Sequence, residues 1–340
     1  MAKISRRTIL LAVVAGAAAP LLPARLTENA KSVDESGFIP AGGIDQWIAI
    51  QGQDDNNPII LFLHGGPAEA ESPFLREFTP WERDFTVVNW DQRGSGKTYG
   101  KNGSATPDMT VERMAEDAVE VAEYALKKLQ KTKLVLVGHS WGALLGFYVV
   151  ARRPDLFYAF VGTGQPVSWA LTIESRERWA REQAAAEHDT AAIQTLDATA
   201  ALPVSDMKRV IASNKWRWSP DDAKYLNIQR DFIGPPPIPT KGDVADWIAG
   251  GDFSGRKLWP TIVSFDARKQ FPRIPTPFFV IQGRDDHIVS SGAAKDYVDQ
   301  VRAPAKAFIP IDGGHYACLT DPSQFISALR QWVMPLITAT

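Results

Sequence analysis

The 340-residue sequence contains a single cysteine, few histidines and almost no net charge. With only Cys318, the chain cannot form an intrachain disulfide or a multi-cysteine metal cluster. The net charge of −2 leaves no electrostatic footprint for nucleic acid. The five histidines show no ligand spacing, so neither a metal nor another cofactor is expected. Apolar residues make up 45% of the chain, which is typical of a globular protein and excludes a disordered one.

The N-terminus has the layout of an export signal. Lys3, Arg6 and Arg7 precede an apolar, alanine-rich run over residues 9–22, and small residues follow. This pattern predicts a twin-arginine-like signal peptide over residues 1–24 and an exported, periplasmic or extracellular bacterial protein. The run is shorter than the roughly 20 residues that span a bilayer, so no stable membrane span is expected after cleavage. An uncleaved anchor and a buried N-terminal helix are the alternatives.

Short apolar runs alternate with helical patterns on both sides of a central region. This rhythm predicts an α/β fold with a mostly parallel sheet flanked by helices. The run 44–50 alternates between apolar and polar residues, as in a half-buried strand, and the other apolar runs are typical of strands buried on both faces. The predicted strands are 44–50, 58–63, 85–90, 133–137, 157–161, 277–282 and 305–311. The predicted helices are 110–130, 141–153, 292–301 and 322–333.

The rhythm stops near residue 165 and resumes near residue 270. The intervening residues contain no buried strand pattern, and residues 234–239 form a proline-rich run that predicts a stiff loop. We therefore expect a helical cap over residues 166–270, inserted into a sheet domain. The two parts of that domain are residues 25–165 and 271–340.

A serine lies where a nucleophile would be expected. Gly138-His139-Ser140-Trp141-Gly142 fits the pattern G-x-S-x-G, directly after a predicted strand and directly before a predicted helix. In such a turn the glycines allow close packing and the Ser140 hydroxyl projects above the carboxyl ends of the strands. The alternative is an unreactive glycine-rich start of a helix.

An oxyanion hole needs two N–H donors. The backbone amide of Trp141 supplies one in a turn of this type. The loop His64-Gly65-Gly66-Pro67 follows an earlier strand, and we expect the Gly66 amide to be the second donor. His64 is interpreted as a structural residue of the loop.

The acid and the base are expected after the serine, in that order. Asp286 follows the predicted strand 277–282 and is the expected acid, with Asp285 the weaker candidate. His315 follows the predicted strand 305–311 and is the expected base. Asp286 would hold the imidazole, and His315 would take the proton of Ser140.

The remaining polar candidates are given structural interpretations. His139 lies within the turn, His287 flanks the acid, and His188 lies in a charged run where it would be solvated. Cys318 is interpreted as a buried, inert thiol.

These motifs together resemble the α/β-hydrolase superfamily and, within it, the proline iminopeptidase group. The resemblance covers roughly residues 37–165 and 271–335. Ala68 stands where the family usually has glycine. The motifs that carry the resemblance are His64-Gly65-Gly66-Pro67, Trp90-Asp91-Gln92-Arg93-Gly94-Ser95-Gly96-Lys97, Gly138-His139-Ser140-Trp141-Gly142, Gly283-Arg284-Asp285-Asp286 and Gly313-Gly314-His315.

The resemblance implies a serine hydrolase that releases an N-terminal residue, often proline, without metal. It places the triad on Ser140, Asp286 and His315, and the oxyanion donors on Gly66 and Trp141. It gives the segment 91–97 a structural role near the site. It also implies acidic cap residues that bind a free amine. A solvated helix face is the favoured interpretation of each single candidate, and the candidates are Glu174, Glu177, Glu182, Asp221 and Asp222.

Six of the eleven tryptophans fall in the predicted cap. Trp169, Trp216 and Trp218 are candidates for lining a substrate pocket, although each could equally pack the cap on the core. The sequence supports two enzymatic hypotheses. The first is an aminopeptidase or amidase acting on short peptides or amino-acid amides, and the second is an exported carboxylesterase or lactonase acting on a small hydrophobic ester. A non-catalytic binding protein of the same fold is the third. The expected partner is a small molecule or short peptide, and the sequence leaves the oligomeric state open.

Overall fold

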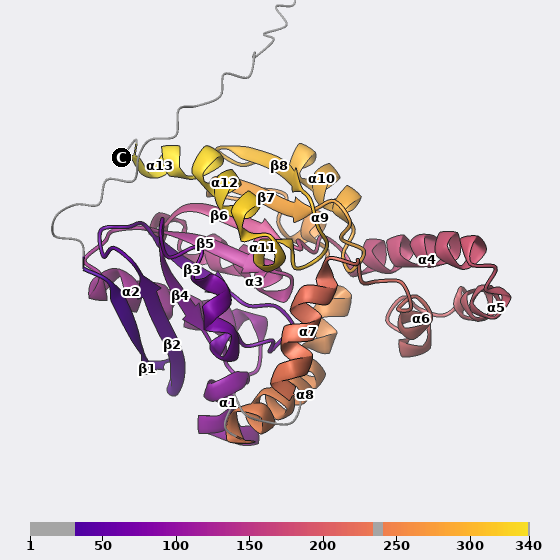
Figure 1. Cartoon of the computed structure of the whole chain (residues 1–340), viewed down its shortest axis with the longest axis horizontal. Helices are drawn as coiled ribbons and strands as arrows, with labels where there is room; N and C mark the ends of the chain where they lie inside the picture. The colour runs from indigo at the N-terminus through magenta and orange to yellow at the C-terminus, as the bar shows by residue number, and fades with distance from the viewer. Residues whose placement is uncertain (1–30, 234–240, 339–340) are drawn as a thin grey trace, which may run out of the picture. The chain divides into compact units, whose positions relative to one another are not determined.

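The computed structural model describes residues 31–233 and 241–338. The predicted signal peptide and the predicted proline-rich loop lie outside these residues. Eight strands form one sheet in the order β1-β2-β4-β3-β5-β6-β7-β8 (Figure 1). The β1–β2 and β2–β4 pairs are antiparallel, and all other pairs are parallel. The strands are β1 (Val33–Ala41), β2 (Ile44–Gly52), β3 (Ile59–Leu63), β4 (Thr86–Trp90), β5 (Leu134–His139), β6 (Phe157–Thr163), β7 (Phe278–Gly283) and β8 (Lys306–Ile311).

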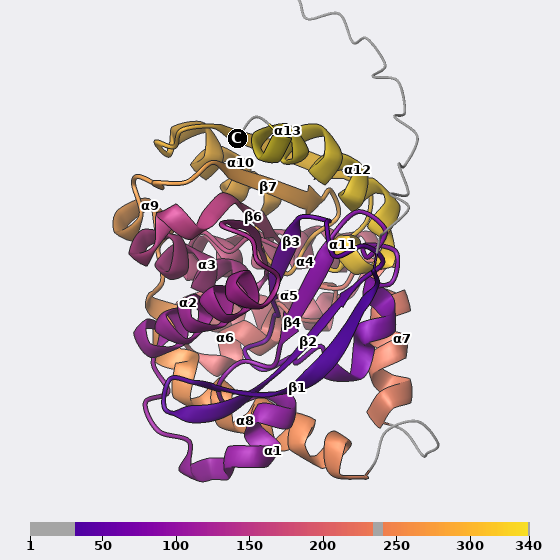
Figure 2. The same cartoon turned by 90° about the vertical axis from the view of Figure 1, so that its left-hand side faces the viewer.

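The strands β3, β4, β5 and β7 are buried at every position, and most of their residues are apolar, because both faces of the sheet are covered. In β3, Ile59, Leu61 and Leu63 join the hydrophobic cluster on one face. Ile60 and Phe62 join the cluster on the other face. One cluster contains residues of α2, α3 and α10, and the other contains residues of α11 and α12 (Figure 2). The sheet is thus the middle layer of a three-layer core.

Helices connect the strands and build the cap. The longest of the core, α2, begins after Thr110, whose hydroxyl accepts a hydrogen bond from the Arg113 amide and caps the helix. The α-helices are α1 (Gly96–Asn102), α2 (Val111–Lys128), α3 (Trp141–Arg152), α4 (Trp169–Ala186), α5 (Thr190–Thr199), α6 (Met207–Ala212), α7 (Asp222–Ile233), α8 (Lys241–Ser264), α9 (Ala267–Gln270), α10 (Ser291–Gln300), α11 (Ala317–Thr320), α12 (Pro322–Trp332) and α13 (Met334–Thr338). Three short 3-10 helices are η1 (Ser72–Phe78), η2 (Gly103–Ala105) and η3 (Pro154–Leu156).

The described residues of the insert, 166–233 and 241–270, have only helices as regular structure, apart from one bridge between Ser168 and Asp266. That bridge lies between the two ends of the inserted region. Helices α4, α5 and α6 contact one another, while α8 packs along α1 (Figure 1). The insert also contacts the core through α7, which packs on α11.

The predicted mostly parallel sheet with flanking helices and a helical insert is confirmed. The predicted strand 44–50 is confirmed as part of β2, but its predicted alternation is wrong, because consecutive side chains from Gln46 to Ile50 are buried on both faces of the sheet. Strand β1 was not predicted, since its polar sequence carries no strand periodicity; it is held by its antiparallel pairing with β2. Within residues 31–233 and 241–338, none of the helices combines the length and apolarity needed to cross a membrane.

Candidate active site

Ser140 lies in a sharp turn between β5 and α3. Its backbone φ is +52° and ψ is −115°, a conformation that side-chain-bearing residues rarely adopt. The flanking glycines make this turn possible: a Cβ at Gly142 would overlap the Leu63 carbonyl, and one at Gly138 would lie 2.5 Å from the Gly142 carbonyl oxygen. The Ser140 amide donates to the carbonyl of Thr163 at 2.9 Å. The serine is thereby fixed at the carboxyl end of β5, beside the N-terminus of α3.

The loop after β3 approaches the same point. His64 bonds through Nδ1 to the Gly65 carbonyl at 2.9 Å, and its Nε2 accepts from the Gln92 amide at 3.1 Å. Burial lowers the pKa of His64 to about 4, so the ring is neutral and its two nitrogens hold the loop. The structure therefore places His64 as a support of the loop.

Both predicted oxyanion donors line the pocket that contains Ser140. Gly66 has a φ of +109°, and a Cβ there would lie 2.6 Å from the Ala68 nitrogen. Trp141 is held by its indole N–H, which donates to Gln92 Oε1 at 3.0 Å. The Gln92 side-chain amide also donates to the His64 carbonyl at 3.1 Å. Gln92 therefore ties the loop after β3 to the turn that carries Ser140.

Asp286 and His315 form a buried pair. His315 Nδ1 lies 2.9 Å from Asp286 Oδ2. Asp286 Oδ1 accepts from the amides of Ile288 and Val289 at 2.9 and 3.1 Å, so the carboxylate is rigidly held. Burial lowers the pKa of His315, but the charge and hydrogen bond of Asp286 outweigh it and leave that pKa above its ordinary value of 6.5. The alternative acid, Asp285, is exposed.

His315 lies against the end of β6, the strand whose last residue, Thr163, accepts the hydrogen bond of the Ser140 amide. Its Cε1 would be 2.7 Å from a Cβ on Gly164, the residue after Thr163. Among the described residues no hydrogen bond joins Ser140 Oγ to His315 Nε2. Such bonds are often long in unliganded enzymes and tighten when substrate binds. The structure therefore brings the acid and the base into contact and sets the serine at the same edge of the sheet.

Two groups that the sequence analysis did not single out as functional support this arrangement. His139 Nε2 lies 3.1 Å from the His315 carbonyl oxygen, and the two rings are 4.8 Å apart. Burial lowers the pKa of His139 well below its usual value, so it is a neutral support of the His315 loop. Glu69, on the loop after β3, bonds the Tyr316 hydroxyl at 3.1 Å. Burial raises the pKa of Glu69, and the adjacent His315 opposes that rise.

The pocket beside Ser140 has a volume of about 130 Å³. Its walls come from α3, from both ends of the insert and from the loop after β7. Most of the lining side chains are apolar, and the charged exception is Arg176. The lining residues besides Gly66, Ser140 and Trp141 are Leu144, Pro166, Trp169, Thr172, Arg176, Ile262, Phe265, Ile288 and Val289.

Of the three candidate tryptophans, Trp169 lines this pocket and the other two lie outside it. Trp216 donates to Glu187 Oε1 at 2.7 Å, and Trp218 stacks on Tyr316 at 5.9 Å. Trp216 therefore makes its contact within the cap, and Trp218 packs against the core.

The candidate acids of the cap also lie outside the pocket lining. Asp222 is buried and accepts hydrogen bonds from the Ser219 and Tyr316 amides, at 3.0 and 2.9 Å. Glu177 is paired with Arg209 at 2.7 Å. The other candidates are exposed: Glu174, Glu182 and Asp221. None of these five carboxylates faces Ser140 across the pocket.

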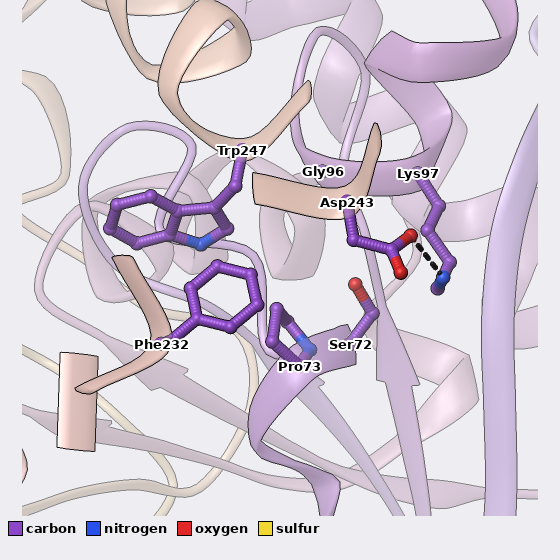
Figure 3. A pocket seen from close by; sticks show the side chains of 7 residues that line it. All are labelled: Ser72, Pro73, Gly96, Lys97, Phe232, Asp243 and Trp247. Atoms are coloured by element: carbon purple, nitrogen blue, oxygen red, sulfur yellow. Dashed lines mark hydrogen bonds and ion pairs between the residues drawn. The ribbon is translucent and has the colours of Figure 1, made fainter. Parts of the chain in front are cut away.

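A second pocket, of about 200 Å³, is lined by residues of η1, α1, α7 and α8 (Figure 3). An ion pair between Lys97 and Asp243 at 2.7 Å borders it, with Phe232 and Trp247 on the opposite side. It contains none of the predicted catalytic residues. Across the described parts of the chain, no group of three or more metal-ligating side chains could hold an ion. Cys318 is buried, which raises the pKa of its thiol.

Residues 58–322 match the model of a family described as the alpha/beta hydrolase fold. The chain is 29% identical over 320 residues to the probable aminopeptidase YbaC of Bacillus subtilis, covering 88% of this chain and 96% of that one. It is 27% identical over 305 residues to a proline iminopeptidase of Lacticaseibacillus rhamnosus, covering 88% and 98%. The crystal structure of a proline iminopeptidase-related protein of Thermus thermophilus superposes with a TM-score of 0.63 at 20% identity, covering 90% of this chain and 99% of that one.

Proposed function

The chain belongs to the α/β-hydrolase family, and we propose that it is a serine hydrolase acting through Ser140, His315 and Asp286. The observation that carries this proposal is the buried bond between Asp286 and His315, set at the same sheet edge as the turn of Ser140. A base whose one nitrogen is held by a carboxylate presents its other nitrogen for proton transfer.

The proposed reaction proceeds through an acyl-enzyme. His315 Nε2 takes the Ser140 proton as Oγ bonds to the substrate carbonyl carbon. The carbonyl oxygen becomes negative and accepts hydrogen bonds from the backbone amides of Gly66 and Trp141. The carbonyl carbon then releases the leaving group, which takes the proton from His315. Water then attacks the acyl carbon while one of its protons passes to His315. The bond between the acyl carbon and Ser140 Oγ breaks, His315 returns the proton to Oγ, and the acid product leaves.

We propose short peptides or amino-acid amides as the substrates, with an aminopeptidase-like preference. The names of the two full-length relatives support this choice. Glu69 lies beside His315 on the loop after β3, outside the lining of the pocket, and in this proposal its carboxylate pairs with a free amine at the substrate's end. In this proposal Glu69 binds the free amine, a role that the resemblance assigned to acidic residues of the cap.

The pocket favours a second candidate, a carboxylesterase or lactonase acting on a substrate without an amine. Its lining is apolar and holds a cation, Arg176, with no carboxylate. A cation there opposes a second cation on the substrate.

A paired assay separates the two candidates. Proline p-nitroanilide, its N-acetyl form and p-nitrophenyl acetate would be compared with wild type, Glu69→Gln and a Ser140→Ala blank. We expect wild type to cleave the free-amine amide at least about 10-fold faster than the acetylated one, since a charged hydrogen bond is worth that factor or more. Glu69→Gln should remove this preference. Ester cleavage with no effect of the amine would establish the second candidate instead.

The pH dependence tests the role of Asp286. Because His315 must be neutral to accept a proton, kcat/KM should fall as the pH drops through its raised pKa, so the acidic limb should lie above 6.5. Asp286→Asn removes the charge that stabilises the imidazolium. We expect the limb to move to lower pH and kcat to drop by about 10⁴.

The matched control is Asp285→Asn, which changes the adjacent but exposed carboxylate. It should leave the limb in place. A limb that Asp286→Asn does not move would remove Asp286 from the triad.

A further inference from the structure

Arg176 is a charged side chain placed in an apolar pocket without a carboxylate partner. It lies on α4, where Trp169, Thr172 and Arg176 follow one another at spacings of three and four residues. Such residues share one face of a helix, and all three line the pocket of Ser140. The helix therefore directs the guanidinium into the pocket.

Among the residues that the structure describes, the guanidinium is held by a hydrogen bond from only one of its nitrogens. Nε donates to the Ile288 carbonyl at 2.8 Å, and Trp169 lies beside the group, 6.0 Å from ring centroid to Cζ. In the described parts of the chain, no carboxylate forms an ion pair with Arg176. The charge of Asp286 acts on Arg176, but its oxygens are already occupied by His315 and by the amides of Ile288 and Val289.

A charged guanidinium in an apolar pocket, close to a second arginine, is energetically unfavourable. Burial and, to a lesser extent, the like charge of Arg217 lower the pKa of Arg176 to about 10, so the group is still charged at neutral pH. Arg217 is half-buried over the Trp218 ring, at 5.0 Å, and it too has no ion-pair partner among residues 31–233 and 241–338. Arg176 is half-buried, and a charged arginine in an apolar setting is rarely left unpaired. An unpaired guanidinium whose fork faces a cavity matches the geometry of a carboxylate.

We propose that Arg176 binds a carboxylate of the substrate, so that the enzyme acts on small substrates with an apolar body and a free carboxylate. This inference rests on the proposed function for its chemistry, but the binding step does not depend on Ser140. It also accommodates both charges near the site: a free amine would pair with Glu69, and the carboxylate of the same substrate would pair with Arg176.

Binding is tested first, with the Ser140→Ala protein. Titration calorimetry would compare 3-phenylpropanoate with the neutral 3-phenylpropanamide. We expect the carboxylate to bind about 10- to 100-fold more tightly, the range of a charge-assisted pair. In Ser140→Ala/Arg176→Gln the two should bind equally, while Arg176→Lys in the same background should retain part of the difference.

The control is Arg178→Gln, also in the Ser140→Ala background. Arg178 is on the same helix but exposed, two residues away and so on another face. This variant should keep the full difference. Equal binding of acid and amide to the Ser140→Ala protein, or equal losses in Arg176→Gln and Arg178→Gln, would overturn the proposal. The melting temperature of each variant reports whether it is folded.

Kinetics then identify the source of the carboxylate. One arm compares prolyl-phenylalanine with its C-terminal amide, and the other compares 4-acetoxybenzoate with its methyl ester. In the arm that the enzyme cleaves, kcat/KM should favour the acid about 10- to 100-fold, and Arg176→Gln should bring the ratio close to 1. No cleavage in either arm, together with selective carboxylate binding, would count against the proposed hydrolysis and leave the role of Arg176 standing. Cleavage with equal rates for acid and neutral forms would contradict the role of Arg176 alone.

Discussion

Replacing Ser140 with alanine is expected to lower kcat by about 10⁴ or more while the protein stays folded. The proposed reaction forms a bond to Ser140 Oγ, and no other described nucleophile lines the pocket except Thr172, which has no histidine partner. Alanine keeps the same backbone requirement at a φ of +52°, so the strain of the turn is unchanged. The measurement is steady-state kinetics on the substrate that wild type cleaves best.

Two controls accompany this variant. Ser36→Ala changes an exposed serine of β1 and should have wild-type activity. The melting temperature of Ser140→Ala should match that of wild type. Turnover of Ser140→Ala within a few-fold of wild type would refute the assignment of the nucleophile.

Replacing Asp117 with asparagine is expected to lower the free energy of unfolding by about 3–5 kcal/mol, because it leaves a buried cation without its counter-charge. Arg93 and Asp117 form an ion pair at 2.7 Å, and both side chains are fully buried. Arg93 also donates to the carbonyls of Gly42 and Pro107, at 2.7 and 3.0 Å. The pair thus ties the segment after β4 to α2 and to the turn between β1 and β2.

Urea denaturation measures this effect as a shift of the midpoint at constant slope. Asp155→Asn is the matched control, since it breaks the exposed pair of Asp155 with Arg153 and should change stability little. The double variant Arg93→Met/Asp117→Leu should recover much of the loss, because it removes both buried charges together. Equal midpoints for Asp117→Asn and Asp155→Asn would show that the buried pair is not a main support of this region.

The structural role that the resemblance gave to the segment 91–97 agrees with its contacts. Asp91 accepts from the Ser72 hydroxyl and the Lys97 amide, at 2.6 and 2.8 Å. Gln92 bridges the loop after β3 and Trp141, and Arg93 reaches Asp117. These side chains hold the loop of Gly66 and the turn of Ser140 in position without facing the pocket.

The sequence by itself determined the sheet, the insert and the order of the predicted catalytic residues. Buried parallel strands need apolar side chains on both faces, so runs such as 59–63 and 134–137 are legible as strands. The turn of Ser140 needs glycine at 138 and 142, which makes that motif visible as well. Strand β1 was missed because it is defined by its partner β2, and pairing leaves no pattern in a polar segment.

Only the tertiary structure decided which side chains meet around Ser140. His139, Glu69 and Arg176 carry no spacing that marks them, and they come from β5, from the loop after β3 and from the cap. Trp169 reaches the pocket while Trp216 does not, although both are tryptophans of the same insert. The physical reason is that periodicity reports which face of an element is buried, while the neighbours of that face depend on how distant elements pack.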